Sequence, residues 1–257
     1  MPQPIKLGIL VPSSNTSLEP LTNTLLSKLS SVEKPTVTVH YSRFPVTQIA
    51  LSATALSQFD DSTILKAAKL LADAEVDLIG WSGTSAGWLG FEADERLCRR
   101  IEEETGIKAT TSVLGLNRLL DISRGSTGHG HDPSFGFVTP YLHDVSASVC
   151  KTYGEAGYLV SAESHLNKTV NTEFARVDED TLDRQMEEVV GKLGAGSPKI
   201  VSTFCTNLRA AQRVAHWEGR YDNLIVLDTV ATVVWDMLRI LEVDYKGIEG
   251  WGKLFQL

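Results

Sequence analysis

One loop of the sequence combines glycines and hydroxyl side chains in a way that suits an anion. Residues 80–87 (GWSGTSAG) follow the apolar run 76–79 and precede a helical pattern that begins near residue 91. A strand that ends in such a loop at a helix start presents free backbone N–H groups. With the hydroxyls of Thr84 and Ser85, these groups suit an anionic oxygen. Many helices begin with such residues and bind nothing, so this loop becomes a candidate binding site only together with similar loops elsewhere in the chain.

Three further loops follow apolar runs in the same way. They carry Asn15 after residues 6–11, Tyr141 after residues 135–138, and Cys205 with Thr206 after residues 199–204. Each also has a simpler interpretation. Free cysteines are often buried structural thiols, an asparagine can merely fix a turn, and a tyrosine at a strand end can be a packing residue. The four loops together are more informative than any one of them.

The composition excludes several classes of function. The 257 residues are 42% hydrophobic and 22% charged, which is ordinary for a globular protein with a sizeable core. A net charge of −8 argues against nucleic acid as the main partner. No apolar run is long enough to span a membrane, and no signal-peptide pattern is present. Three widely spaced cysteines form neither a disulfide framework nor a zinc motif, so a cytoplasmic location is expected.

The hydrophobic periodicity predicts alternating strands and helices along the chain. Strands are expected at residues 6–11, 37–41, 76–79, 135–138, 157–162, 199–204 and 224–227. Helices are expected at residues 16–29, 61–74, 93–105, 143–156, 180–193, 205–217 and 229–241. Thr16 and Glu19 have the spacing of a capping box. Residues 110–120 predict a short polar start and a helix, and residues 123–133 an exposed loop or boundary.

The pattern restarts after residue 134, which indicates an internal duplication. Each half reads as a β-α-β-α-β-α unit, so the predicted fold is α/β with two pseudo-symmetric lobes, each a parallel sheet flanked by helices. The expected lobes are residues 1–122 and 134–228, with the closing helix and tail, 229–257, packed on the first lobe. Ligands bind beyond the carboxyl ends of strands in such sheets. The four loops should therefore surround one cleft between the lobes.

The motifs that line this expected cleft resemble a known superfamily. Residues 8–16 (GILVPSSNT), 83–85 (GTS), 138–141 (VTPY) and 202–205 (STFC) together are similar to the aspartate/glutamate/hydantoin racemase superfamily, in the branch of maleate cis-trans isomerases and arylmalonate decarboxylase. The resemblance implies an enzyme without cofactor or metal that handles a small dicarboxylate or arylmalonate-like substrate. It leaves monomers and homo-oligomers both open.

The chain departs from the two-cysteine pattern of the racemases and maleate isomerases. Gly83 stands where the first-half cysteine would fall, whereas Cys205 matches the second-half cysteine, an arrangement similar to arylmalonate decarboxylase. In contrast, Asn15 and Asn171 resemble the carboxylate-binding asparagines of maleate isomerases. The sequence thus combines features of two branches.

The expected chemistry is decarboxylation of a substituted malonate through an enediolate. Thr84, Ser85 and Tyr141, with N–H groups near Cys205 and Thr206, would stabilise the enediolate oxygens. The Cys205 thiol would then protonate carbon from one face. Two alternatives stay open: cis-trans isomerisation or racemisation of a small carboxylate, and non-catalytic carboxylate binding.

The remaining candidates have simpler explanations. Trp81 and Trp88 flank the loop at residues 80–87 and either pack in the core or line a pocket for a bulky group. Arg43 either pairs with a carboxylate or is a solvated surface residue. Cys98 and Cys150 lie in helical segments and are expected to pack. Residues 129–132 (HGHD) suggest a metal motif, but they lie at the amino end of a strand, so no metal site is expected there.

Overall fold

The protein consists of two four-stranded parallel sheets, which confirms the predicted fold class. The computed structural model describes residues 4–29, 36–126, 133–194 and 198–257. The two sheets have the same strand order, β2-β1-β3-β4 and β6-β5-β7-β8. Their strands are β1 (Ile5–Pro12), β2 (Val37–Phe44), β3 (Leu78–Trp81) and β4 (Ala109–Thr111), then β5 (Ser134–Thr139), β6 (Val160–His165), β7 (Lys199–Thr203) and β8 (Leu224–Asp228).

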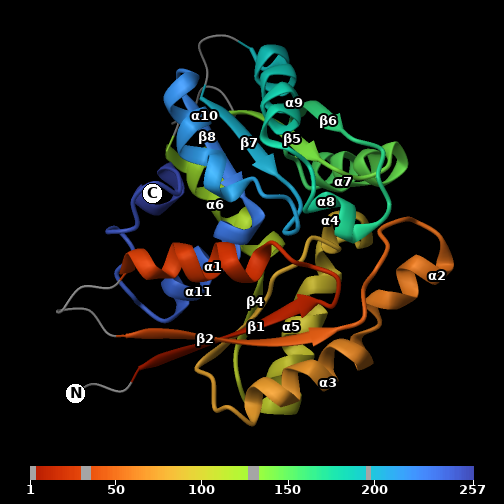
Figure 1. Cartoon of the computed structure of the whole chain (residues 1–257), viewed down its shortest axis with the longest axis vertical. Helices are drawn as coiled ribbons and strands as arrows, with labels where there is room; N and C mark the ends of the chain where they lie inside the picture. The colour runs from red at the N-terminus through yellow and green to blue at the C-terminus, as the bar shows by residue number, and fades with distance from the viewer. Residues whose placement is uncertain (1–3, 30–35, 127–132, 195–197) are drawn as a thin grey trace.

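Helices cover both faces of each sheet (Figure 1). The first half contains α1 (Leu18–Leu26), α2 (Ala53–Leu56), α3 (Asp61–Ala72), α4 (Ala86–Leu89), α5 (Phe91–Thr105) and α6 (Ser112–Ser126). The second half contains α7 (His143–Glu155), α8 (Asn171–Phe174), α9 (Glu179–Lys192), α10 (Val214–Arg220) and α11 (Thr229–Ile240). The inner strands β1, β3, β5 and β7 are mostly buried, as parallel strands covered on both faces must be, whereas the edge strands β2 and β6 are partly exposed.

The closing helix of each half reaches across to the other half. Helix α11 follows β8, yet its Met237 lies so close to Gly80 of β3 that a Cβ on this glycine would be 2.5 Å from the sulfur. Helix α6 follows β4, and its Leu120 borders a hollow that Phe135 of β5 also lines. The two helices cross in close contact, because a Cβ on Gly115 would lie 2.5 Å from the Thr232 carbonyl oxygen. Because α6 packs on the second lobe and α11 on the first, the two lobes share one hydrophobic core.

Two features differ from the expected domain outline. Helix α6 continues to Ser126, past the expected boundary at residue 122. The tail beyond α11 lies on the second lobe, since the Lys253 ammonium donates to the Leu224 carbonyl (2.8 Å) and the Lys253 amide donates to Glu218 (2.8 Å). The buried Leu254 and Phe255 hold this tail in place.

Several predicted element boundaries were wrong because pairing between strands decides them. Strand β2 runs through Phe44, since it pairs with β1 along its whole length and does not break at Ser42. Residues 109–111, predicted as a polar start, form strand β4 because β3 offers them a free edge. Strands β3 and β6 lie two or three residues later than predicted.

The expected capping box is absent. Helix α1 begins at Leu18, and the Asn15 side chain caps it by accepting hydrogen bonds from the amides of Ser17 and Leu18, both at 3.0 Å. The Glu19 carboxylate instead pairs with Arg43 at 2.7 Å. Arg43 also donates to the Ser13 and Asn15 carbonyls, so it braces the loop after β1.

The predicted helix at residues 205–217 is also wrong at its start. Residues 204–210 form an irregular loop, and α10 begins only at Val214. The loop contacts the first lobe instead of continuing a helix, because the side chain and the carbonyl of Asn207 accept hydrogen bonds from Thr16 and Ser17, directly before α1.

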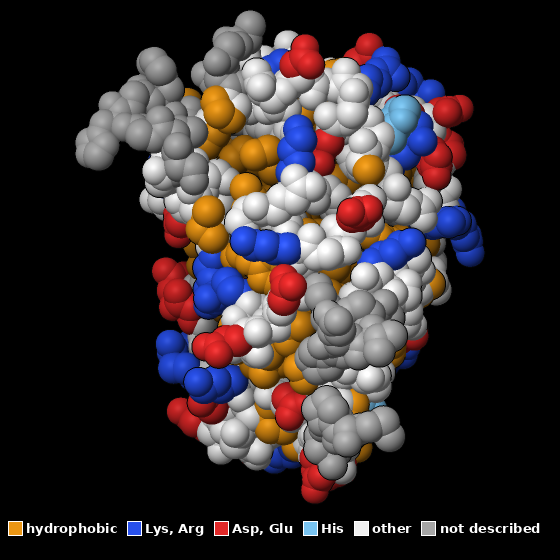
Figure 2. Space-filling view, turned by 90° about the vertical axis from the view of Figure 1, so that its left-hand side faces the viewer, with side chains coloured by type: hydrophobic (Ala, Val, Ile, Leu, Met, Phe, Trp, Pro, Cys, Tyr) orange, Lys and Arg blue, Asp and Glu red, His pale blue; other side chains and the backbone are white. Residues whose placement is uncertain are grey.

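The surface mixes charges of both signs. Figure 2 shows acidic and basic side chains interspersed over one face, with apolar atoms exposed between them. Within the described residues, every helix is too short or too polar to cross a bilayer.

The contact between the exchanged helices yields a test of stability. Asp236 of α11 is fully buried and pairs with Arg118 of α6, Arg239 of α11 and Thr110 of β4. Asp236→Ala should lower the free energy of unfolding by about 3 kcal/mol, the low end for a broken buried pair, because both arginines reach solvent. Urea denaturation measures this change. The exposed Glu95→Ala on α5 is the control and should change it by less than about 0.5 kcal/mol. Equal effects of both variants would contradict this account of the contact.

Candidate active site

One cavity between the lobes collects most of the predicted site residues. It forms at the carboxyl ends of the strands, where the loops after β1 and β3 meet those after β5 and β7. The predicted residues that line it are Gly83, Thr84, Ser85, Tyr141, Asn171, Cys205 and Thr206. Asn15 is buried but does not line the cavity.

Tyr141 connects the polar groups contributed by the two lobes. Its hydroxyl shares a hydrogen bond with the Thr84 hydroxyl, with the oxygens 2.8 Å apart. Burial raises the pKa of Tyr141 well above its ordinary value, so the phenol stays protonated and is available as a donor. Cys205 lines the same cavity, so Thr84, Tyr141 and Cys205 surround one space between the lobes.

Opposing effects act on the Cys205 thiol. Burial raises its pKa to about 11, because the low-dielectric interior disfavours a thiolate. Hydrogen bonds from Tyr141 and from the backbone N–H groups of Asn207 and Leu208 act the other way and lower the pKa. The sulfur is therefore neutral at rest, and the Tyr141 hydroxyl in the same cavity favours a negative charge on it.

The other two thiols lie outside this cavity. Cys98 of α5 and Cys150 of α7 are both partly exposed free cysteines. Burial and the neighbouring Asp94 raise the pKa of Cys98, and burial raises the pKa of Cys150 to about 11. Within the described residues, Cys205 is thus the thiol that faces the polar groups of the cleft.

Gly83 cannot carry a side chain in this arrangement. A Cβ at this position would lie 2.0 Å from the indole ring of Trp81, which is itself almost fully buried. Trp81 therefore fills the space that a second thiol would need. The ring packs against Phe44 at 5.0 Å between centroids, so the sheet holds it in place.

The asparagines mainly hold the lobes together. The side-chain amide of Asn15 donates to the Thr206 hydroxyl (3.1 Å), which in turn donates to the Ser82 carbonyl (3.2 Å). The side-chain amide of Asn171 donates to the Ser14 hydroxyl (2.8 Å). The side-chain oxygen of Asn207 accepts from the backbone N–H of Thr16 at 3.0 Å. Sequence reasoning missed Asn207, although its place directly after Cys205-Thr206 was a local signal.

An apolar wall forms the remaining side of the cavity. Its residues are Pro12, Val46, Ile49, Phe59, Trp81 and Trp88. Trp88 packs edge-on against Tyr141 (5.4 Å between centroids) and against Phe59 (5.9 Å). Sequence reasoning considered the two tryptophans but missed Val46, Ile49 and Phe59, whose only signal was apolar character in the irregular segment after β2.

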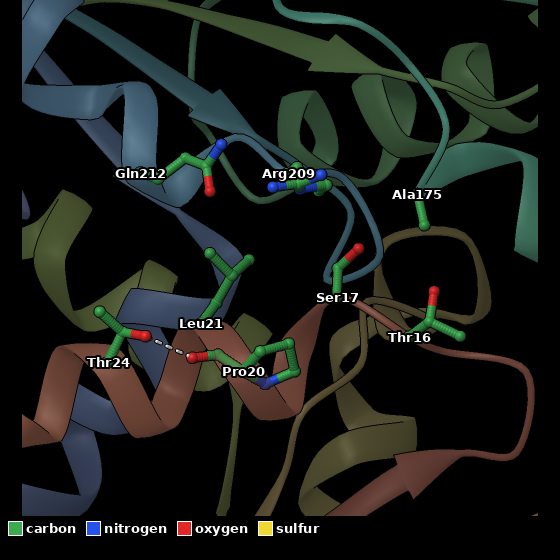
Figure 3. Close-up of a pocket in the computed structure, with 8 residues that line it drawn as sticks. All are labelled: Thr16, Ser17, Pro20, Leu21, Thr24, Ala175, Arg209 and Gln212. Atoms are coloured by element: carbon green, nitrogen blue, oxygen red, sulfur yellow. Dashed lines mark hydrogen bonds between the residues drawn. The ribbon is translucent and has the colours of Figure 1, made fainter.

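A second, more open hollow of about 470 Å³ lies between α1 and the loop after Cys205 (Figure 3). Its lining is Thr16, Ser17, Pro20, Leu21, Thr24, Ala175, Arg209 and Gln212. Although it is larger, it contains neither a thiol nor a carboxylate, so the smaller cavity with Cys205 is the candidate active site. The metal motif considered at residues 129–132 lies outside the described residues.

Comparisons with known proteins place the sequence and the fold near one group of enzymes. No family model matches the chain. Over 250 residues, 95% of this chain and 94% of the relative, it is 24% identical to a maleate isomerase from Pseudomonas putida strain KT2440.

Solved structures share the whole fold. The maleate isomerase Iso from Pseudomonas putida S16 aligns with a TM-score of 0.82 and 21% identity over 98% of each chain. A variant of Nocardia farcinica maleate cis-trans isomerase with a covalently bound succinylcysteine intermediate gives 0.81 and 19% over 98% of each chain. Liganded arylmalonate decarboxylase, as a double variant, gives 0.76 and 17% over 98% of this chain and 99% of that one. The chain is thus similar in sequence to a maleate isomerase and shares its fold with maleate isomerases and arylmalonate decarboxylase, which is consistent with the resemblance drawn from the motifs.

Proposed function

We propose that this protein is a cofactor-independent enzyme that isomerises a small cis-unsaturated dicarboxylate of the maleate class to its trans form, with Cys205 as the nucleophile. The observation that carries the proposal is the Cys205 thiol in one cavity with the hydroxyls of Thr84 and Tyr141, whose oxygens lie 2.8 Å apart. Hydroxyl donors beside a sulfur stabilise a thiolate, which is both the attacking and the leaving group in this reaction. The sequence relationship to a maleate isomerase supports the same choice over decarboxylation.

The reaction needs one thiol and no net proton transfer to carbon. After the thiol proton is lost to solvent, the thiolate attacks one alkene carbon and forms a C–S bond. The π electrons move into the adjacent carboxylate as an enediolate, whose oxygens the hydroxyls of Thr84 and Ser85 would stabilise. Rotation about the new C–C single bond follows. The enediolate then collapses, restores the double bond in the trans geometry and expels the thiolate.

Decarboxylation of a substituted malonate is the second candidate, and two observations favour it. Gly83 leaves a single thiol in the cavity, and Phe59 and Trp88 offer an apolar surface against which a carboxylate would be desolvated. In this reaction the departing carboxylate leaves an enediolate, and the neutral Cys205 thiol gives its proton to carbon. A proton from solvent would then convert the Cys205 thiolate back to the thiol.

The substrate test separates the candidates. Incubation with maleate should yield fumarate, followed by NMR, and Cys205→Ala should lower this rate at least about 10³-fold because the nucleophile is lost. Cys150→Ala, which removes a thiol outside the cavity, should retain it. Release of CO₂ from phenylmalonate without fumarate formation would favour the decarboxylase. Thermal stabilisation by either acid without turnover would leave only carboxylate binding.

The pH dependence gives an independent test. Because the Cys205 pKa is about 11, the thiolate fraction rises roughly tenfold per pH unit from about pH 7 to pH 10. The kcat/KM for maleate should rise in proportion. A reaction that uses the neutral thiol as an acid would not accelerate over this range, since the thiol form is already fully populated. A flat profile for maleate would therefore contradict nucleophilic attack by a thiolate.

The close approach of the Trp81 ring to Gly83 predicts that position 83 tolerates no side chain. Gly83→Ala should destabilise the protein by about 1 to 3 kcal/mol through overpacking and lower activity. Gly191→Ala on α9, where a Cβ would meet nothing within 4 Å, is the matched control and should not destabilise it. The double variant Trp81→Leu/Gly83→Ala should lose less stability than the sum of the single variants, and strict additivity would argue against this contact.

A further inference from the structure

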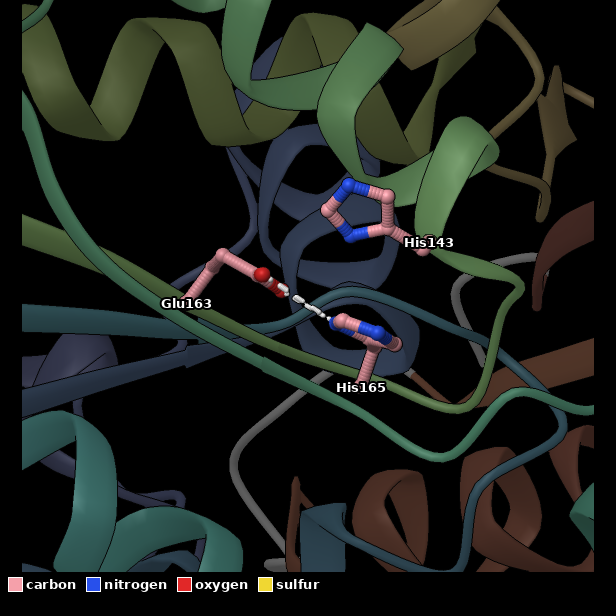
Figure 4. A group of neighbouring side chains, drawn as sticks. All are labelled: His143, Glu163 and His165. Carbon is pink, nitrogen blue, oxygen red and sulfur yellow. Dashed lines mark hydrogen bonds and ion pairs between the residues drawn. The ribbon is translucent and has the colours of Figure 1, made fainter.

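A cluster of two histidines and a glutamate lies on the second lobe, outside the cavity with Cys205. His143 is the first residue of α7, and Glu163 and His165 alternate along β6, which places them on the same face of the strand. The His165 Nδ1 lies 3.0 and 3.1 Å from the two Glu163 carboxylate oxygens, and the imidazole rings of His143 and His165 are 5.1 Å apart. The three side chains point toward one another (Figure 4).

The donor set and its spacing suit a divalent transition metal. One ligand atom from each residue can be chosen so that all three lie within 4.8 Å of one another. Ligand atoms around a tetrahedral zinc with bonds of roughly 2.1 Å lie about 3.4 Å apart, so small side-chain rotations would close the site. Two imidazoles with one carboxylate form a ligand set that binds Zn²⁺ and leaves a coordination position open.

The backbone already holds the two contributing elements together. The His143 amide donates to the Asn167 side-chain oxygen (3.2 Å), and the Asn167 amide donates to the Tyr141 carbonyl (3.0 Å). The Lys168 amide donates to the Pro140 carbonyl (2.9 Å). Because β6 is an edge strand and His143 is exposed, an ion has access to the cluster from solvent. A frame that is already ordered lowers the entropic cost of binding.

We propose that His143, Glu163 and His165 form a binding site for a divalent transition metal, with Zn²⁺ as the preferred ion, separate from the catalytic cavity. An ion there would connect the end of β6 to the start of α7. These are the two segments that bond the loop carrying Tyr141, so an occupied site would brace that loop.

The test is a metal titration of the full chain after treatment with a chelator. Calorimetry with Zn²⁺ should show one site per chain, and His143→Ala or His165→Ala should weaken binding more than about 100-fold. Glu163→Gln, which keeps the side-chain volume, should also weaken it. Zn²⁺ should raise the melting temperature of the parent protein but not that of His165→Ala. The same shift in His165→Ala as in the parent would overturn the proposal.

Matched controls test other histidines and thiols of the chain. The exposed His216→Ala, the thiol variants Cys150→Ser and Cys205→Ala, and the double variant His129→Ala/His131→Ala should all keep the affinity. Co²⁺ bound in place of Zn²⁺ should give visible absorption bands without a thiolate charge-transfer band. The absence of saturable binding, or its loss in the His129/His131 variant with retention in His143→Ala, would overturn the proposal.

Discussion

The hydrogen bonds of Asn207 to the first lobe decide where the Cys205 sulfur lies. The side-chain oxygen of Asn207 accepts from the amides of Thr16 and Ser17, and its carbonyl accepts from the Ser17 hydroxyl. These contacts hold residues 204–210 against the segment directly before α1 and keep them from forming a helix. The Leu208 amide donates to the Cys205 carbonyl (3.1 Å), which closes the turn that carries the thiol. The contacts of Asn207 thus join the lobes and position this turn.

Burial of this site makes its donors effective. In a low-dielectric environment a hydrogen bond to a charged sulfur or carboxylate is stronger than in water, but an unpaired charge is more costly. Both effects act on Cys205: burial raises the pKa of the thiol, whereas the hydrogen bonds from Tyr141 and the nearby backbone lower it. A thiol that is buried and neutral is a poor target for oxidation, because susceptibility follows thiolate character and exposure.

Local sequence patterns predicted the sheets and the loops, but not the contacts made across the lobes. The apolar runs that became β1, β5, β7 and β8 are strong signals because both faces of these strands are buried. Strand β4 is only three residues long, and its strand character comes from pairing with β3. The roles of Val46, Ile49 and Phe59 depend on contacts such as the Ile49 amide to the Thr169 carbonyl (2.9 Å), which joins segments more than a hundred residues apart.

The duplicated architecture also explains why a single thiol can be sufficient. Both halves bring a strand end to the cleft, at Gly83 after β3 and at Cys205 after β7. Chemistry that removes a proton from one face and returns it to the other needs a reactive group at both ends. In this chain the indole of Trp81 occupies the space beside Gly83, so only one end can react with the substrate. A reaction in which the same sulfur attacks and leaves satisfies that constraint, as does protonation from one face, whereas racemisation between two thiols does not.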